Sequence, residues 1–69
     1  MVEVFKTNVR KKTDGKKLLG SLLEVFPTYT MNFDLSDRDK VLRIQGENIE
    51  ALQIIIHLRE YGYSCEPLD

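Results

Sequence analysis

The chain has 69 residues, of which 42% are apolar and 30% charged, and its net charge is −1. This balance is typical of a folded domain, and the longest apolar run, residues 54–56, is far short of the roughly 20 residues that cross a bilayer, so a disordered, collagen-like or membrane-inserted chain is excluded. The first residues lack the basic and apolar segments of a secretory signal, and the single cysteine cannot form an internal disulfide, so we expect a cytoplasmic protein.

The first third of the chain predicts a strand followed by a helix. Residues 2–9 are rich in β-branched and aromatic side chains, which favours a strand. The polar residues 10–15 predict a loop, in which Thr13 or Asp14 is expected to cap the next helix. Apolar residues then recur at helical spacing, and Pro27 ends this helix because the residue before a proline avoids the α conformation.

The middle of the chain predicts an antiparallel hairpin. Apolar and polar side chains alternate through residues 28–35, which indicates a strand with one buried face and one exposed face. Residues 36–39 predict a turn. Residues 40–45 predict the second strand of the hairpin, with Leu42 and Ile44 on one face.

The last third predicts a helix and a short strand. Asn48 is expected to cap the helix and Gly62 to end it. The core face of this helix is expected to carry Ala51, Ile54, Ile55, Leu58 and Tyr61. Residues 63–68 predict the last strand, in which Pro67 fits only near the end or at a sheet edge.

This order of elements, β-α-β-β-α-β, predicts an α+β fold. With right-handed crossovers it gives a ferredoxin-like sandwich, in which a four-stranded antiparallel sheet carries both helices on one face. We see no linker, repeat or low-complexity segment, so we expect residues 1–69 to form a single domain.

Three segments together carry a resemblance to a known family. They are residues 5–9 ahead of a polar loop and helix, residues 39–44 at the start of a strand, and residues 61–63 after the second helix. Their sequence and spacing resemble the heavy-metal-associated domain, the fold of small copper chaperones and of the N-terminal modules of metal-pumping ATPases. The resemblance covers nearly the whole chain.

The resemblance places the family's metal motif, Met-x-Cys-x-x-Cys, at Val9, Lys11 and Asp14. Neither Lys11 nor Asp14 supplies a thiolate, which is what soft metals select, and the ammonium of Lys11 repels cations. The resemblance therefore implies a degenerate member that has lost its metal chemistry. The pair Gly62-Tyr63 matches the prokaryotic pattern of the family, which implies that Tyr63 packs near the degenerate loop.

Three other residues are alternative metal ligands, namely Cys65, Met31 and His57. Cys65 on a short strand is typical of a small buried hydrophobe, and Met31 alternates with core residues. His57 is expected on the outer, solvated side of the second helix, without a partner at ligand spacing. One cysteine cannot form a chelating pair, although a dimer could bring two together. A metal-binding or metal-transport accessory protein stays open as the alternative.

A basic cluster surrounds the predicted start of the first helix and consists of Arg10, Lys11, Lys12, Lys16 and Lys17. It is either a solvated surface or, with Tyr63 nearby, a contact for an anion or an acidic partner, since free N–H groups at a helix start attract negative charge. Nucleic acid is not expected as a partner, because no aromatic residues interleave with the lysines and no RNA-binding motif marks the strands.

The second predicted helix carries more apolar residues than one face needs. Ile49, Leu52 and Ile56 lie together beside the core stripe. They either wrap the core or contact a second subunit, so a homodimer is possible.

No catalytic arrangement is recognisable in the sequence. Ser21, Ser36 and Ser64 have no nearby histidine or base, and the phosphate-binding glycine pattern is missing. We therefore predict a non-enzymatic protein-interaction module without a cofactor, which acts through the basic loop and the sheet edges. A sensor of small anions is a weaker alternative that rests on fold analogy.

Overall fold

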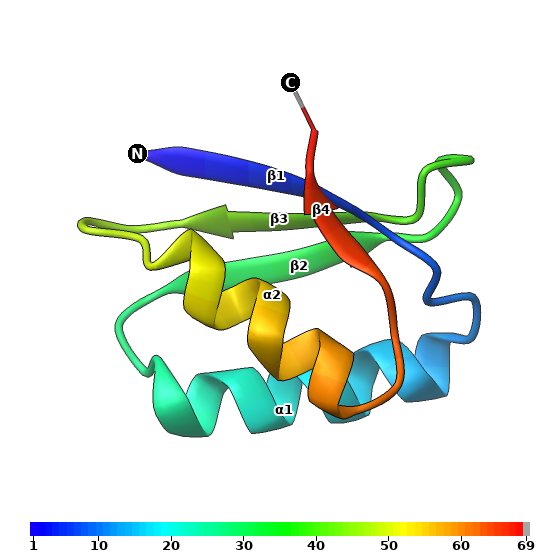
Figure 1. The fold of residues 1–69 in the computed structure, drawn as a ribbon, viewed down its shortest axis with the longest axis horizontal. Coiled ribbons are helices and arrows are strands. Elements are labelled where there is room, and N and C mark those ends of the chain that lie inside the picture. The colour runs from blue at the N-terminus through cyan, green and yellow to red at the C-terminus, as the bar shows by residue number, and fades with distance from the viewer. Residues whose placement is uncertain (69) are drawn as a thin grey trace.

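The computed structural model describes residues 1–68. The elements follow the order β1 (Val2–Thr7), α1 (Lys12–Val25), β2 (Thr30–Asp34), β3 (Val41–Gln45), α2 (Ala51–Glu60) and β4 (Cys65–Pro67). The strands form one antiparallel sheet in the order β2-β3-β1-β4. Both helices lie on the same side of this sheet (Figure 1). The prediction of an α+β fold with four antiparallel strands and two helices is confirmed.

The β2–β3 hairpin confirms the alternating pattern of the sequence. Met31 pairs with Ile44, and Phe33 pairs with Leu42. All four side chains belong to the core or pack against it. The alternate residues of β2 are exposed, so the strand has one face that packs on the core and one wet face, as the period of two requires.

The core lies between the sheet and the two helices. Its largest fully buried side chains include Phe5, Leu18, Leu22, Leu42, Ile44, Ile54 and Leu58. They come from both helices and from the two central strands, because an apolar helix stripe and an apolar sheet face must cover each other. Pro67 is the last residue of the edge strand β4, where a missing N–H is tolerated.

The first strand and first helix differ from the prediction at their junction. β1 ends at Thr7, and α1 already begins at Lys12, so Thr13 and Asp14 lie within its first turn and do not cap it. The N-cap residue is Lys11, which forms no side-chain capping bond. The predicted boundaries were wrong here because the chain turns at Thr7, whose amide and hydroxyl donate to the carbonyls of Asp39 and Lys40, residues distant in the sequence.

The start of α2 also differs from the prediction. Asn48 has a φ of 51° and does not cap the helix, which begins at Ala51 after Glu50. The hydroxyl of Tyr29 accepts a hydrogen bond from the Glu50 amide at 3.0 Å and donates one to the Asn48 carbonyl at 2.8 Å. A tyrosine about twenty residues earlier therefore fixes the entry to this helix.

Tyr61 was wrongly predicted as a core residue, since 56% of it is exposed. α2 ends at Glu60, so Tyr61 sits at the C-cap position with a ψ of 2° and leaves the helical stripe. Its ring stacks on His57 with the ring centroids 5.2 Å apart. In the structure as described, neither helix has the length and apolar content that crossing a membrane requires.

Candidate functional site

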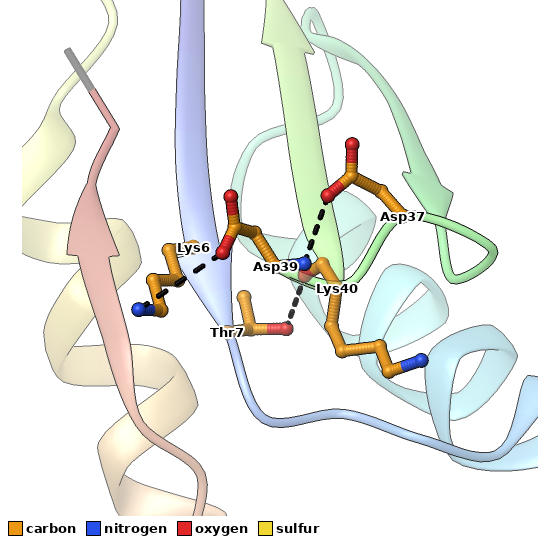
Figure 2. Close-up of polar contacts among 5 residues, drawn as sticks. All are labelled: Lys6, Thr7, Asp37, Asp39 and Lys40. Carbon is orange, nitrogen blue, oxygen red and sulfur yellow. Dashed lines mark hydrogen bonds and ion pairs between the residues drawn. The ribbon is translucent and has the colours of Figure 1, made fainter.

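The loop between β1 and α1, where the family resemblance placed a metal motif, is held by hydrogen bonds from Thr7. The Thr7 amide donates to the Asp39 carbonyl at 3.0 Å, and its buried hydroxyl donates to the Lys40 carbonyl. The same hydroxyl accepts the Val9 amide at 3.2 Å. Figure 2 shows how Thr7 thereby joins this loop to the turn of the β2–β3 hairpin.

The hairpin turn is itself fixed by polar contacts around Asp39. The Asp39 amide donates to the Asp37 carboxylate at 2.8 Å, and the Lys6 ammonium lies 4.0 Å from the Asp39 carboxylate (Figure 2). Lys40 adopts a φ of 48°, and its ammonium donates to the Leu35 carbonyl at 3.0 Å. The turn thus presents its carbonyls to Thr7 in a defined geometry.

The three positions to which the resemblance assigned a metal motif lie in very different surroundings. Val9 is fully buried in the core, whereas Lys11 is exposed. Asp14 lies beside Tyr63: partial burial raises the pKa of Tyr63, and the charge of Asp14 and hydrogen bonding to it raise that pKa further. The loop is also tied to the segment before β4, because the Ser64 amide donates to the Asn8 side chain at 2.8 Å.

The alternative metal ligands do not converge within one chain. Met31 is in β2 and Cys65 is in β4, which are the opposite edges of the sheet. Three interstrand spacings separate these edges, which is roughly 14 Å. Within residues 1–68, no group of three His, Cys, Asp or Glu side chains has the arrangement of a metal site.

Cys65 is buried in the core and has little thiolate character. Its side chain is only 2% exposed and belongs to the core cluster. Burial raises the pKa of the Cys65 thiol to about 12, against a smaller opposing effect of the Arg59 charge. Because the thiolate is the form that binds soft metals and reacts with electrophiles, this cysteine is a structural residue in the isolated chain.

An open groove of about 650 Å³ runs between α1 and β2. It is lined by Arg10, Lys12, Gly15, Lys16, Leu19, Asn32, Phe33, Asp34, Leu35 and Ser36. The α1 residues of the lining are spaced along one side of the helix. The lining on the β2 side extends beyond the strand into the turn that follows it. The sequence pointed to the cations, but it did not show that they and β2 share one groove.

Gly15 allows α1 to approach β2 closely enough to form the floor of this groove. A Cβ atom at Gly15 would lie 3.3 Å from Cδ2 of Phe33 and 3.7 Å from Cδ1 of Leu35. The polar residues 10–15 predicted a loop that includes Gly15, yet Gly15 is a buried residue of the helix. A small residue at this position is therefore a packing requirement, which local sequence patterns could not reveal.

The groove carries an excess of positive charge. Of the basic cluster, Arg10, Lys12 and Lys16 line it, whereas Lys11 and Lys17 do not. Within residues 1–68 the ion-pair criterion of 4.0 Å is met by Lys6 and Asp39, and by no cation of the cluster. The cations at the groove are thus free to attract an external anion.

The single carboxylate in the groove lining belongs to Asp34. Its oxygen accepts hydrogen bonds from the Ser36 hydroxyl at 2.6 Å and from the Ser36 amide at 3.2 Å. The Ser36 side chain is the largest cause of a lowered pKa of Asp34, and the Arg43 charge lowers it slightly further. Asp34 therefore stays charged at neutral pH and holds the turn after β2.

The structure corrects the expectation that Ser21 has no histidine near it and that His57 is fully solvated. Ser21 Oγ and His57 Nε2 are 2.8 Å apart, and Ser21 Oγ and the Tyr61 hydroxyl are also 2.8 Å apart. His57 is partly buried. Among the residues that the structure describes, no carboxylate forms an ion pair with His57. The cluster thus joins α1 to α2 without the acid that orients the histidine of a catalytic triad.

The predicted self-association residues fall into two groups. Ile49 packs against the core, whereas Leu52 and Ile56 are 66% and 41% exposed. A homodimer through this surface stays a prediction. Sedimentation of the wild-type chain beside Leu52→Glu tests it, since a charge at an exposed contact residue weakens association without entering the core.

Comparison of the chain with protein-family models, with curated proteins and with solved structures gave no match.

Proposed function

We propose that this chain is a small non-enzymatic protein-interaction module with a ferredoxin-like fold of the heavy-metal-associated type. The strand order β2-β3-β1-β4 and the position of both helices on one side of the sheet are compatible with that fold. The sequence resemblance supports the family assignment, with Lys11 and Asp14 in place of the metal-binding cysteines.

The observation that carries this proposal is the groove between α1 and β2. It combines partly buried apolar side chains with unpaired cations beside a sheet edge. Such a surface offers an apolar contact area, a charge that steers a partner, and backbone groups that can pair. The loop before α1 is held in place by hydrogen bonds of Thr7 and Asn8 within the chain, which gives this side of the groove a defined shape.

Affinity capture with charge-matched variants tests the proposal. The wild-type chain is compared with Lys12→Glu/Lys16→Glu, in the groove, and with Lys11→Glu/Lys17→Glu, outside it. Both double variants change the net charge equally on the same helix segment, so non-specific electrostatic capture responds to both alike. We expect proteins from a native lysate that the wild-type and the outside variant retain and the groove variant loses. Equal capture by all three chains would contradict the proposal.

Titration with Cu(I) and Zn(II) under reducing conditions tests the metal alternative. Because the Cys65 thiol is buried and Met31 lies at the opposite sheet edge, we expect no stoichiometric binding at micromolar concentration. Tight binding that is lost in Cys65→Ala would favour a metal-handling protein in place of the interaction module.

A further inference from the structure

We infer that the groove binds an extended acidic segment of a partner protein, which adds as a new strand to the free edge of β2. This inference deepens the proposed function and rests on it, since it names the chemistry and the geometry of the partner. Three features of the groove carry it: the pairing capacity of β2, the apolar floor, and the placement of the cations.

The edge of β2 is competent to pair with another strand. Within residues 1–68, β2 is hydrogen-bonded only to β3, along all five residues of Thr30–Asp34. In an antiparallel pair, alternate residues direct their N–H and C=O groups away from the partner strand, so the outer edge of β2 presents backbone donors and acceptors. β2 contains no proline, and five residues in extended conformation span roughly 16 Å. This length suits a short peptide strand.

The floor of the groove gives such a strand an apolar contact. Leu19, Phe33 and Leu35 line the groove and are only partly buried. Gly15 keeps α1 close to the β2 side chains. A strand added beside β2 would direct every second side chain toward α1, where this floor lies. At least one of these side chains is therefore apolar.

The cations determine the remaining side chains of the partner. Arg10 and Lys12 lie at the beginning of α1, Lys16 follows one turn later, and Leu19 comes next along the same side of the helix. The carboxylates of the partner therefore lie toward Arg10 and Lys12, and its apolar side chain lies toward Leu19. All three cations come from α1 or the loop before it, so the carboxylates and the apolar side chain must project from the same face of the added strand. They therefore occupy every second residue of the peptide.

A second copy of this chain does not fit the same edge. Symmetric pairing of two β2 strands would bring two cationic rims together, and like charges at an interface oppose association. An acidic strand from a different protein neutralises Arg10, Lys12 and Lys16 while it pairs with β2. Charge complementarity thus selects a heterologous acidic segment.

Selection from a random peptide library displayed on phage tests this inference directly. The wild-type chain serves as bait, and the variants Lys12→Glu/Lys16→Glu and Lys11→Glu/Lys17→Glu serve as counter-baits. We expect enriched peptides that carry acidic and apolar residues at every second position, so that these side chains share one face of the strand. We expect a synthetic copy of such a peptide to bind the groove variant at least about tenfold more weakly than the wild-type, and the outside variant within a few-fold.

Amide hydrogen exchange distinguishes strand addition from simple charge attraction. With the selected peptide bound, exchange of alternate β2 amides is expected to slow, because their outward N–H groups then donate to the peptide. Uniform effects on all lysine variants, or protection confined to residues outside β2, would overturn the inference. Enrichment of basic or purely apolar peptides, or no enrichment, would also overturn it.

Failure of the strand-addition inference can be distinguished from failure of the proposed function. A partner that is captured specifically but crosslinks to the chain outside the groove would leave an interaction module with a different binding surface. Absence of specific capture, together with absence of enriched peptides, would remove both proposals.

Discussion

The two edges of the sheet differ in the features that control whether another strand can pair with them. β4 has three residues and ends at Pro67, which has no N–H to donate. β2 has five residues, no proline, and an open groove along it. Short strands and prolines are common ways in which proteins block sheet edges, and charged side chains are another. The backbone of β4 therefore blocks pairing at one edge, whereas at the β2 edge only the charged side chains restrict which strand can pair.

This difference matters because charge is a selective barrier. Proline and short length exclude every incoming strand alike, whereas Arg10, Lys12 and Lys16 repel cationic strands and attract anionic ones. The β2 edge can therefore discriminate among partners, and the β4 edge cannot.

The largest loss of stability is expected from Leu42→Ala, because Leu42 lies in the central strand β3, between β1 and the edge strand β2. It is fully buried and pairs with Phe5 in β1 and with Phe33 in β2. Truncation of a buried leucine costs about 2–5 kcal/mol, so most of the stability of so small a domain should be lost. Urea denaturation followed by circular dichroism measures the loss.

The matched control for this prediction is Leu52→Ala, since Leu52 is 66% exposed. We expect the control to change the free energy of unfolding by less than about 0.5 kcal/mol. Loss of amide protection in β2 without loss in β4 would show that the two edges do not share one cooperative core.

An intermediate loss of stability is expected from Thr7→Val. Valine keeps the shape of the side chain but leaves the Lys40 carbonyl and the Val9 amide without their hydrogen-bond partner. Removing one partner from buried polar groups costs about 1–3 kcal/mol. Urea denaturation measures the change, and Thr30→Val, on the exposed face of β2, is the control. An equal change in both variants would contradict the role given to Thr7.

The smallest effect on stability is expected from the titration of Cys65 at the β4 edge, because this thiol loses its proton only in alkaline solution. Its pKa of about 12 in the folded chain lies above the value near 9 of an unperturbed thiol. The folded state thus holds its proton more tightly, so the associated stability is complete below pH ~9 and is lost as the pH rises toward ~12. Urea midpoints measured across this range, with Cys65→Ala as the control, test the slope.

Alkylation of the Cys65 thiol gives a second measurement of the same property. Because the thiol is buried and protonated, iodoacetamide should react far more slowly with the native chain than with the chain in urea. Equal rates in the two conditions would show that β4 opens freely, which would remove the contrast between the edges.

Much of the fold could be predicted from local patterns. Alternation through β2, with Phe33 packed against the core and Asn32 exposed, correctly identified the core-facing and wet faces. The helical spacing of Leu18 and Leu22, or of Ile54 and Leu58, correctly identified side chains of the core. These patterns work because residues two apart in a strand, or four apart in a helix, share a face whatever surrounds them.

The helix ends and the candidate site could not be predicted to the same degree. The sequence identified the basic cluster but not which cations line the groove, since that depends on how closely α1 approaches β2 at Gly15. It missed the contact between Ser21 and His57, which are 36 residues apart in the chain. It also assigned the cap of α2 to Asn48, where the hydroxyl of Tyr29 fixes the helix start.

Local sequence patterns were enough to predict the order of strands and helices and the main core residues. The position of β2 at an open edge, with Arg10, Lys12 and Lys16 beside it, depends on how the whole chain packs and could not be predicted from those patterns. The physical reason is one of range. Backbone preference and side-chain period act over a few residues, whereas edges, grooves and interhelical bonds arise only when distant segments pack together.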